Sequence, residues 1–286
     1  MKKRVIIVST LIGGLFLSID SLAQHKIEKI WETEPVLEFS EGVVPDPSGK
    51  FLFVSNTIGN PMAKDGIGTI SKVGFDGKII DLAWVKGLNA PKDIQIFDNK
   101  IYVADLDEVI VVDIAKGEVS ERILIEGARL LHNITFDDKG GVFVSDMFTG
   151  KIHLIQNGQI STYIENMQSA AGLHWENGNL YVLTGSFQGP DSGKLNKVAP
   201  DKSVSVLASG MDGRMNGLQK VKEGEFLASN WGGVLYYINA DGKVETLRDT
   251  RDQNIPAGIL YYNPETNSFY ISSDQHNILY AFKLID

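Results

Sequence analysis

The chain of 286 residues contains no cysteine. This absence excludes disulfide bonds, thiolate nucleophiles, thiolate metal sites and a lipid anchor on an N-terminal cysteine. Basic residues are also few: 27 lysines and arginines stand against 36 aspartates and glutamates, which gives a formal net charge of −9. Nucleic-acid binding is disfavoured, because recognition of phosphates needs a basic face. The acidic surface is more typical of plain solubility.

Long apolar runs are missing except near the N-terminus. Residues 2–4 are basic, Val5–Leu17 is mainly apolar, and small residues precede a predicted cleavage site after Ala23. The apolar run is shorter than the ~20 residues that a membrane span needs, so removal is favoured over an uncleaved anchor. The sequence therefore predicts a signal peptide over residues 1–23 and one domain over residues 24–286. It predicts a bacterial protein exported to the periplasm or beyond the cell, with no membrane association after cleavage.

Short strand-like runs separated by turns are clearest between His132 and Ile164. This stretch holds four such runs, and the last two are joined by Asn157-Gly158, a strong hairpin signal. Four antiparallel strands of this kind form a small sheet with apolar side chains on both faces, so the sheet needs similar neighbours. The same pattern occurs six times, with openings at Glu41, Lys92, His132, Ala171, Asn216 and Ala257.

The sixth copy reaches the C-terminus after its third strand. The alternating segment His25–Glu34 precedes the first copy and can supply the missing fourth strand. Such a connection closes a ring and protects edge strands that would otherwise aggregate. We therefore predict an all-β fold, a six-bladed β-propeller of four-stranded antiparallel blades closed by the N-terminal strand. A β-sandwich or an open array is the alternative, and no helix is predicted.

Two connections are longer than the others, Thr57–Gly68 and Ser186–Gly193. In a propeller both would lie on the face where the first strand of each blade begins. Long loops on one face are typical of a binding mouth, although they can also be tolerated insertions. Polar residues at the starts of first strands and the ends of second strands should converge there. These are Glu41, Asn56, Lys92, Asp93, Asp105, His132, Asn133, Asp146, Asn216, Asn230, Trp231 and Asp274.

Several of these residues have a structural and a functional interpretation. Carboxylates and amides are ligands for hard cations such as calcium, but Asp and Asn at strand ends also cap turns, which we favour for Asp105, Asp146 and Asp274. A buried Glu41 needs a cation, either a metal or Lys92. His132 is a candidate general base or third metal ligand, or an inner histidine without a site role. Trp231 could support a sugar or lactone ring, or pack between blades.

The segment SEGVVPDPSGKFLFVSN, residues 40–56, resembles the first-blade signature of the senescence marker protein/gluconolactonase/luciferin-regenerating-enzyme family. MNGLQ at residues 215–219 and VSDMFTGKIHLI at 144–155 are also similar to that family. NHL-repeat and strictosidine-synthase-like propellers share several of these motifs. The resemblance implies six blades, one divalent metal in the channel, often calcium or zinc, and hydrolysis of lactones or related esters.

The family's metal is typically held by a Glu that opens the first blade, an Asn that opens the fourth and an Asp that opens the fifth. Here Glu41 matches the first position, but Ala171 and Asn216 occupy the other two. The third blade, where family members often contact substrate with Asn-Asp, has His132-Asn133. The site is therefore either rebuilt around Glu41, His132 and Asn216, or no longer hydrolytic.

Two functional hypotheses follow. The leading one is a metal-assisted hydrolase of a lactone or small ester, and the alternative is a non-catalytic propeller whose mouth binds a small molecule, glycan or protein. Either would be a monomer. An apolar rim formed by the two long loops would favour the binding hypothesis. The predicted site residues are His132 and Asn216 as catalytic residues, Lys92, Asn133, Asn230 and Trp231 as substrate-binding residues, and Glu41 and Asn216 as ligands of calcium or zinc.

Overall fold

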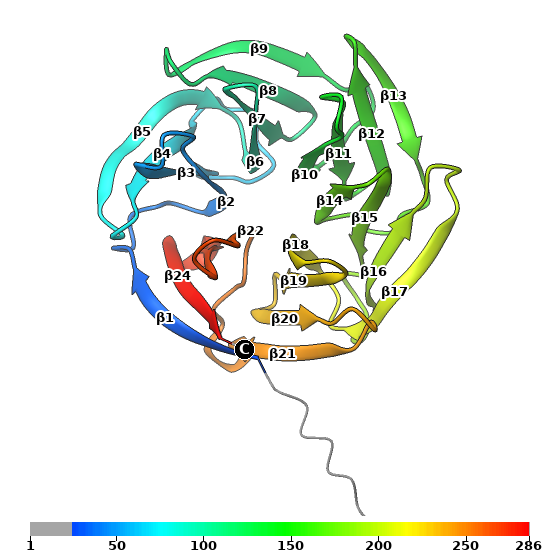
Figure 1. Ribbon diagram of the computed structural model, residues 1–286. Helices are drawn as coiled ribbons and strands as arrows, with labels where there is room; N and C mark the ends of the chain where they lie inside the picture. Colours follow the sequence, from blue (N-terminus) through cyan, green and yellow to red (C-terminus); the bar gives the residue numbers. More distant parts are fainter. Residues whose placement is uncertain (1–24, 286) are drawn as a thin grey trace, which may run out of the picture.

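The computed structural model describes residues 25–285, and the predicted signal peptide lies outside this range. Six antiparallel sheets of four strands each are arranged around a central axis (Figure 1). This confirms the predicted six-bladed β-propeller. The helices in residues 25–285 are two single 3-10 turns, η1 (Arg251–Gln253) and η2 (Asp274–His276). Neither has the length or apolar character to cross a membrane.

In blades 1 to 5 the strands follow chain order from the centre of the ring to its rim (Figure 1). Blade 1 consists of β2 (Ser40–Pro45), β3 (Phe51–Asn56), β4 (Gly68–Gly74) and β5 (Ile79–Leu88). Blade 2 consists of β6 (Pro91–Phe97), β7 (Lys100–Asp105), β8 (Glu108–Asp113) and β9 (Glu118–Leu124). Blade 3 consists of β10 (Leu131–Phe136), β11 (Val142–Asp146), β12 (Lys151–Gln156) and β13 (Gln159–Ile164).

The last three blades repeat this layout. Blade 4 consists of β14 (Leu173–Glu176), β15 (Asn179–Thr184), β16 (Gly193–Val198) and β17 (Val204–Met211). Blade 5 consists of β18 (Met215–Lys222), β19 (Glu225–Asn230), β20 (Val234–Ile238) and β21 (Val244–Asp249). Blade 6 consists of β22 (Leu260–Asn263), β23 (Ser268–Ser273), β24 (Ile278–Ile285) and β1 (Lys26–Glu32).

Blade 6 closes the ring. β1 pairs antiparallel with β24, from Lys26 opposite Ile285 to Glu32 opposite Tyr280, and Figure 1 shows the two strands side by side. The predicted completion of the last blade by the N-terminal strand is therefore confirmed. The pairing covers the outer edge of β24, which would otherwise present unpaired backbone groups.

The apolar core lies between the blades. Alternate residues of each strand face opposite sides of its sheet, so each blade can pack against both neighbours. In one cluster Phe53 of blade 1 packs with Ile94 and Val103 of blade 2, and all three are fully buried. In another cluster Phe143 of blade 3 packs with Val182 of blade 4. Packing of every sheet on two others holds the inner strands in fixed positions around the channel.

The strand register shows which residues of the inner strands lie at the same level. Glu41 stands two residues before a residue paired with the second strand, and so do its counterparts in the other blades. In blade 6 the counterpart of Glu41 is Gly258, because Leu260 pairs with Ile271 and Gly258 stands two residues before it. The predicted counterpart, Ala257, is one residue too early. The residues that lie at this level, one on each inner strand, are Glu41, Lys92, His132, Ala171, Asn216 and Gly258.

The next residue on each inner strand faces the neighbouring blade. A Cβ added to Gly42 would lie 2.6 Å from the backbone nitrogen of Ile94 and 2.8 Å from the carbonyl oxygen of Lys92. Only glycine permits this close approach of β2 and β6. In blade 2 the equivalent residue is Asp93, whose Oδ2 instead accepts a hydrogen bond from the Ile134 N–H at 3.0 Å.

Candidate functional site

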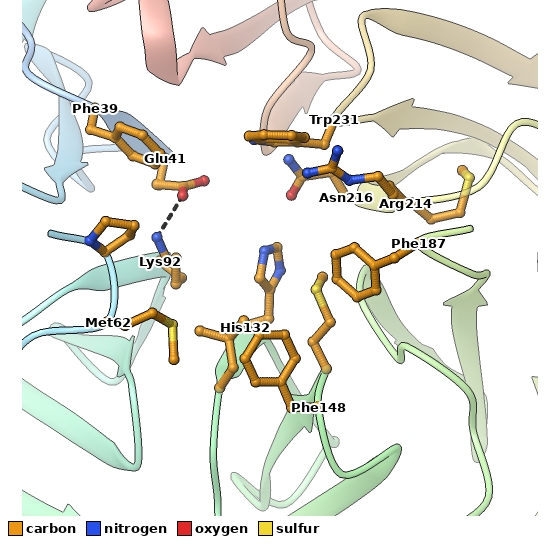
Figure 2. Close-up of a pocket in the computed structure, with 14 residues that line it drawn as sticks. Phe39, Glu41, Met62, Lys92, His132, Phe148, Phe187, Arg214, Asn216 and Trp231 are labelled. Atoms are coloured by element: carbon orange, nitrogen blue, oxygen red, sulfur yellow. Dashed lines mark hydrogen bonds and ion pairs between the residues drawn. The ribbon is translucent and has the colours of Figure 1, made fainter. Parts of the chain in front are cut away.

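A pocket opens at the mouth of the channel, where the inner strands begin (Figure 2). Its cavity volume is about 160 Å³. An engineered apolar cavity of roughly 150 Å³ binds benzene, so this space can hold a small organic group. The lining residues are Phe39, Glu41, Pro61, Met62, Lys92, Leu130, His132, Met147, Phe148, Phe187, Arg214, Met215, Asn216 and Trp231.

Glu41 and Lys92 form a buried ion pair at one side of the pocket (Figure 2). Lys92 Nζ lies 2.7 Å from Glu41 Oε1, and each side chain is 5% exposed. Lys92 Nζ also donates to Thr57 Oγ1 at 3.3 Å. Glu41 Oε2 has no hydrogen-bond partner in residues 25–285. The ion pair considered as the alternative to a metal is thus present, and one carboxylate oxygen remains free to accept a donor from a ligand.

His132 lies at the base of the pocket, on β10 (Figure 2). Its Nδ1 lies 2.7 Å from Asn133 Oδ1, so the ring proton sits on Nδ1 and donates to that oxygen. Burial lowers the pKa of His132 to about 4, partly offset by this hydrogen bond. The imidazole is therefore neutral at pH 7, and the lone pair of Nε2 can accept a proton. The imidazole is thus neutral and oriented, as a general base must be, but a pKa of about 4 makes it a weak base at pH 7.

Arg214 and Trp231 form the opposite side of the pocket (Figure 2). The Arg214 guanidinium lies 3.6 Å from the centre of the Trp231 ring and 5.5 Å from that of Phe187. Trp231 Nε1 donates to Asp274 Oδ2 at 2.5 Å. Burial raises the pKa of Asp274 to about 6, and the negative charge of Glu41 adds to the shift. Trp231 thus packs against a cation and is oriented by a carboxylate.

The rim of the pocket is apolar. Met62 comes from the Thr57–Gly68 loop and Phe187 from the Ser186–Gly193 loop, and they are 47% and 46% exposed. Phe148 is 42% exposed, and its ring centre lies 6.2 Å from that of Phe187. Exposed apolar side chains that gather around a cavity are typical of ligand-binding sites. The two long loops therefore contribute to an apolar rim, the feature expected if the mouth binds a ligand without hydrolysing it.

Of the predicted asparagines, Asn216 lies in the pocket and Asn133 lies behind it. The Asn216 side chain is buried, and its Oδ1 has no hydrogen-bond partner in residues 25–285. Asn133 is not among the lining residues. Its Oδ1 contacts His132, and its Nδ2 donates to Asp93 Oδ2 at 3.4 Å. Asn133 therefore orients the histidine from outside the pocket lining.

Asn230, the fourth predicted substrate-binding residue, is also absent from the pocket lining. Its Nδ2 donates to the carbonyl oxygens of Asp212, at 3.0 Å, and Gly213. These residues form the turn directly before Arg214. The backbone at Arg214 has φ = 60°, a left-handed conformation that is unfavourable for a side chain of this size. Asn230 thus supports the turn that places Arg214 over the mouth.

The aspartates interpreted as caps divide into two groups. Asp105 accepts backbone N–H groups of residues 89 and 90 at 2.8 and 2.5 Å, and Asp146 accepts those of residues 129 and 130 at 3.0 and 3.1 Å. Both residues are structural. Asp146 also caps its turn by accepting the N–H groups of Phe148 and Thr149 at 3.2 Å, whereas the backbone bonds of Asp105 hold the segment before its inner strand. Asp274 differs, because its Oδ2 accepts the indole N–H of Trp231.

The sequence interpretation missed Arg214 and the apolar side chains of the rim. Arg214 stands two residues before Asn216, which opens the fifth copy, and Lys92 opens the second, so a cation near a strand start was an available signal. The apolar character of Met62 and Phe187 was visible within the two long loops. Phe148 lies in an ordinary-length turn, and nothing in its neighbourhood distinguishes it from a packed residue.

The residues of the mouth fit a divalent metal poorly. Glu41, the one carboxylate that lines the pocket, is already paired with Lys92, and Arg214 adds a second positive charge. Ala171 and Gly258 contribute no ligand atom to the ring of inner residues. No group of three or more His, Asp or Glu side chains in residues 25–285 is placed to hold a metal ion. Glu41 Oε2 and Asn216 Oδ1 remain as free acceptors. The predicted calcium or zinc stays a prediction.

Comparisons with known proteins identify the fold alone. No protein-family model matches the chain, and no curated protein matches its sequence. A catalytically inactive variant of virginiamycin B lyase from Staphylococcus aureus, crystallised with quinupristin, is 11% identical over 92% of this chain and 100% of its own, with a TM-score of 0.64. A gluconolactonase-like protein is 12% identical over 92% and 93%, with a TM-score of 0.62. A chain of the nidogen/laminin complex is 14% identical over 78% and 84%, with a TM-score of 0.60.

Proposed function

We propose that the channel mouth binds a small organic molecule with an apolar body. The observation that carries this proposal is the convergence of Met62, Phe148 and Phe187, three exposed apolar side chains, on one cavity. Such side chains are normally buried, and a cavity lined by apolar groups with a few polar atoms is typical of a small-molecule site. The polar atoms here are Glu41 Oε2 and Asn216 Oδ1, which can orient the bound molecule.

Phe187→Asp should weaken binding of N-phenyl-1-naphthylamine, a neutral apolar fluorophore, by about tenfold or more, since a buried aromatic contact is worth about 1.5–3 kcal/mol. Fluorescence titration measures the dissociation constant. Ile160→Asp is the matched control, because Ile160 is 42% exposed on β13 at the outside of blade 3. Equal affinities of the wild type and Phe187→Asp would show that the fluorophore does not use the mouth.

A second candidate is hydrolysis of a lactone or small ester in the same pocket, with His132 as general base. The neutral, oriented imidazole favours it. Its Nε2 would take a proton from water as the water oxygen attacks the carbonyl carbon, and would return the proton to the departing alkoxide oxygen. The positive charge of Arg214 would stabilise the negative charge on the carbonyl oxygen. The structural likeness to a gluconolactonase-like propeller supports this candidate.

His132→Gln should lower the turnover of γ- and δ-lactones by about 10²–10⁴-fold, the contribution typical of a general base. Wild-type activity should stay level from pH 8 to pH 5 and fall near the pKa of His132, about 4. Proton release measured by pH-stat, with and without added calcium, gives the rates. His174→Gln is the control, because burial also lowers the pKa of His174 to about 4, but its ring packs against Tyr181 and Phe226. Equal rates for His132→Gln and wild type would eliminate this candidate.

A further inference from the structure

The Arg214 guanidinium lines the pocket and forms no ion pair within residues 25–285. Arg122 and Arg251 form ion pairs with carboxylates. No carboxylate in residues 25–285 forms an ion pair with Arg214, and its buried Nε has no hydrogen-bond partner. A buried donor left unsatisfied costs free energy, which an acceptor from a ligand would recover.

The guanidinium is also held in position before any ligand arrives. It lies between the rings of Trp231 and Phe187, and Trp231 is fixed by Asp274 through its indole N–H. The backbone N–H of Trp231 donates to the carbonyl oxygen of Arg214 at 3.0 Å, which fixes the left-handed turn. A planar guanidinium stacked on an aromatic ring keeps its edge donors available for bidentate hydrogen bonds. Little side-chain entropy remains to be lost on binding.

The charge of the pocket has the opposite sign to that of the chain. Its charged lining residues are Glu41, Lys92 and Arg214, one anion and two cations, which sum to +1, whereas the chain has a formal charge of −9. Because Glu41 and Lys92 neutralise each other, the unbalanced charge resides on Arg214. Asp274 adds negative charge near Arg214 and partly offsets the lowering of the Arg214 pKa by burial, but its two oxygens already accept N–H groups of Trp231 and Gln275.

We propose that the natural ligand is an apolar monocarboxylate, whose carboxylate pairs with Arg214 while its hydrocarbon or aromatic body lies within the apolar rim. The inference rests on the proposed small-molecule site and adds the ligand's chemical class. A planar monoanion matches both the fork of the guanidinium and the single unbalanced charge. A phosphate monoester, a dianion of tetrahedral shape, matches neither. In ester hydrolysis the acid product would belong to this class.

The test compares 4-phenylbutanoate with 4-phenylbutanamide, which differ in charge but hardly in shape. Isothermal titration calorimetry at pH 7.5 should show the carboxylate binding about tenfold to a hundredfold more tightly than the amide, the range for hydrogen bonds to charged groups. Arg214→Gln should remove that preference, and Arg214→Lys should restore part of it, because lysine keeps the charge without the fork. Thermal unfolding of each variant establishes that it is folded.

Arg248→Gln is the matched control. Arg248 also stacks on aromatic rings, with its guanidinium 5.1 Å from the Tyr280 ring centre and 5.3 Å from that of Phe282, but it lies on the outer strand β21. This variant should keep the full preference for the carboxylate. Equal binding of carboxylate and amide by the wild type would overturn the assignment to Arg214 and leave the apolar site intact. Binding of neither probe, together with no binding of the neutral fluorophore, would overturn both proposals.

Discussion

Lys92→Met should lower the free energy of unfolding by about 3–5 kcal/mol, the cost of removing one member of a buried ion pair. Lys92 Nζ lies 2.7 Å from Glu41 Oε1, and both side chains are 5% exposed. Methionine fills a similar volume but leaves the carboxylate without a cation, and Glu41 Oε2 already lacks a partner. Urea denaturation at pH 7 and low salt measures the change.

Two further variants separate charge burial from the loss of packing. Lys92→Met combined with Glu41→Gln should recover most of the lost stability, because the isolated charge is then removed. Lys29→Met serves as the exposed control. Lys29 and Glu32 are 53% and 45% exposed in their pair, so this change should cost less than about 1 kcal/mol. A double variant as unstable as Lys92→Met would show that the lysine acts through its hydrocarbon chain.

Asp93→Asn should change how stability depends on pH. Burial raises the pKa of the Asp93 carboxyl to about 7, against an ordinary value of 3.8. Between these values the native state holds a proton that the unfolded chain has released. The contribution of Asp93 to the free energy of unfolding is therefore fully present below pH 4 and is lost as the pH rises through 7. The shift of about three pH units corresponds to roughly 4 kcal/mol.

The free energies of unfolding of wild type and Asp93→Asn should accordingly diverge by roughly 4 kcal/mol between pH 4 and pH 8, with the variant gaining relative to wild type. Chemical denaturation at one-unit pH intervals measures the divergence. Asp274 and His132 titrate in both proteins, so their contributions cancel in the difference. Because burial is the main cause of the shift, 0.5 M salt should leave the divergence nearly unchanged. A constant difference across this pH range would contradict the prediction.

The fold could be predicted because its signal is repeated. Six copies of one strand pattern constrain each other, and Asn157-Gly158 marks a hairpin with few alternatives. The spare alternating segment at His25–Glu34 then had one natural place, beside the strand that ends the chain. One position was predicted wrongly: Ala257 was assigned to the level of Glu41 in blade 6, where the structure has Gly258. Alanine and glycine are both small and stand next to each other here, so the sequence does not show which of them faces the channel.

The site was less accessible because it depends on which side chains meet. Glu41, Lys92, His132 and Asn216 were found from their shared register, and the structure brings all four to one cavity. Asn133 and Asn230 occupy equally suggestive positions, but hydrogen bonds to His132 and to the turn before Arg214 use their amides. Whether an amide faces inward or supports a neighbour depends on side-chain packing across blades, which a single strand's pattern does not encode.

The pairing of β1 with β24 has a consequence for how the protein is made. The two strands are far apart in the sequence, so the last blade cannot be completed until the residues of β24 have been synthesised. Until then blade 1 has one neighbour, and the apolar face toward blade 6 remains open to other chains. Closing so long a loop is slow, because its entropy must be lost before the contacts form. We therefore expect the protein to be most prone to aggregation before β1 pairs with β24.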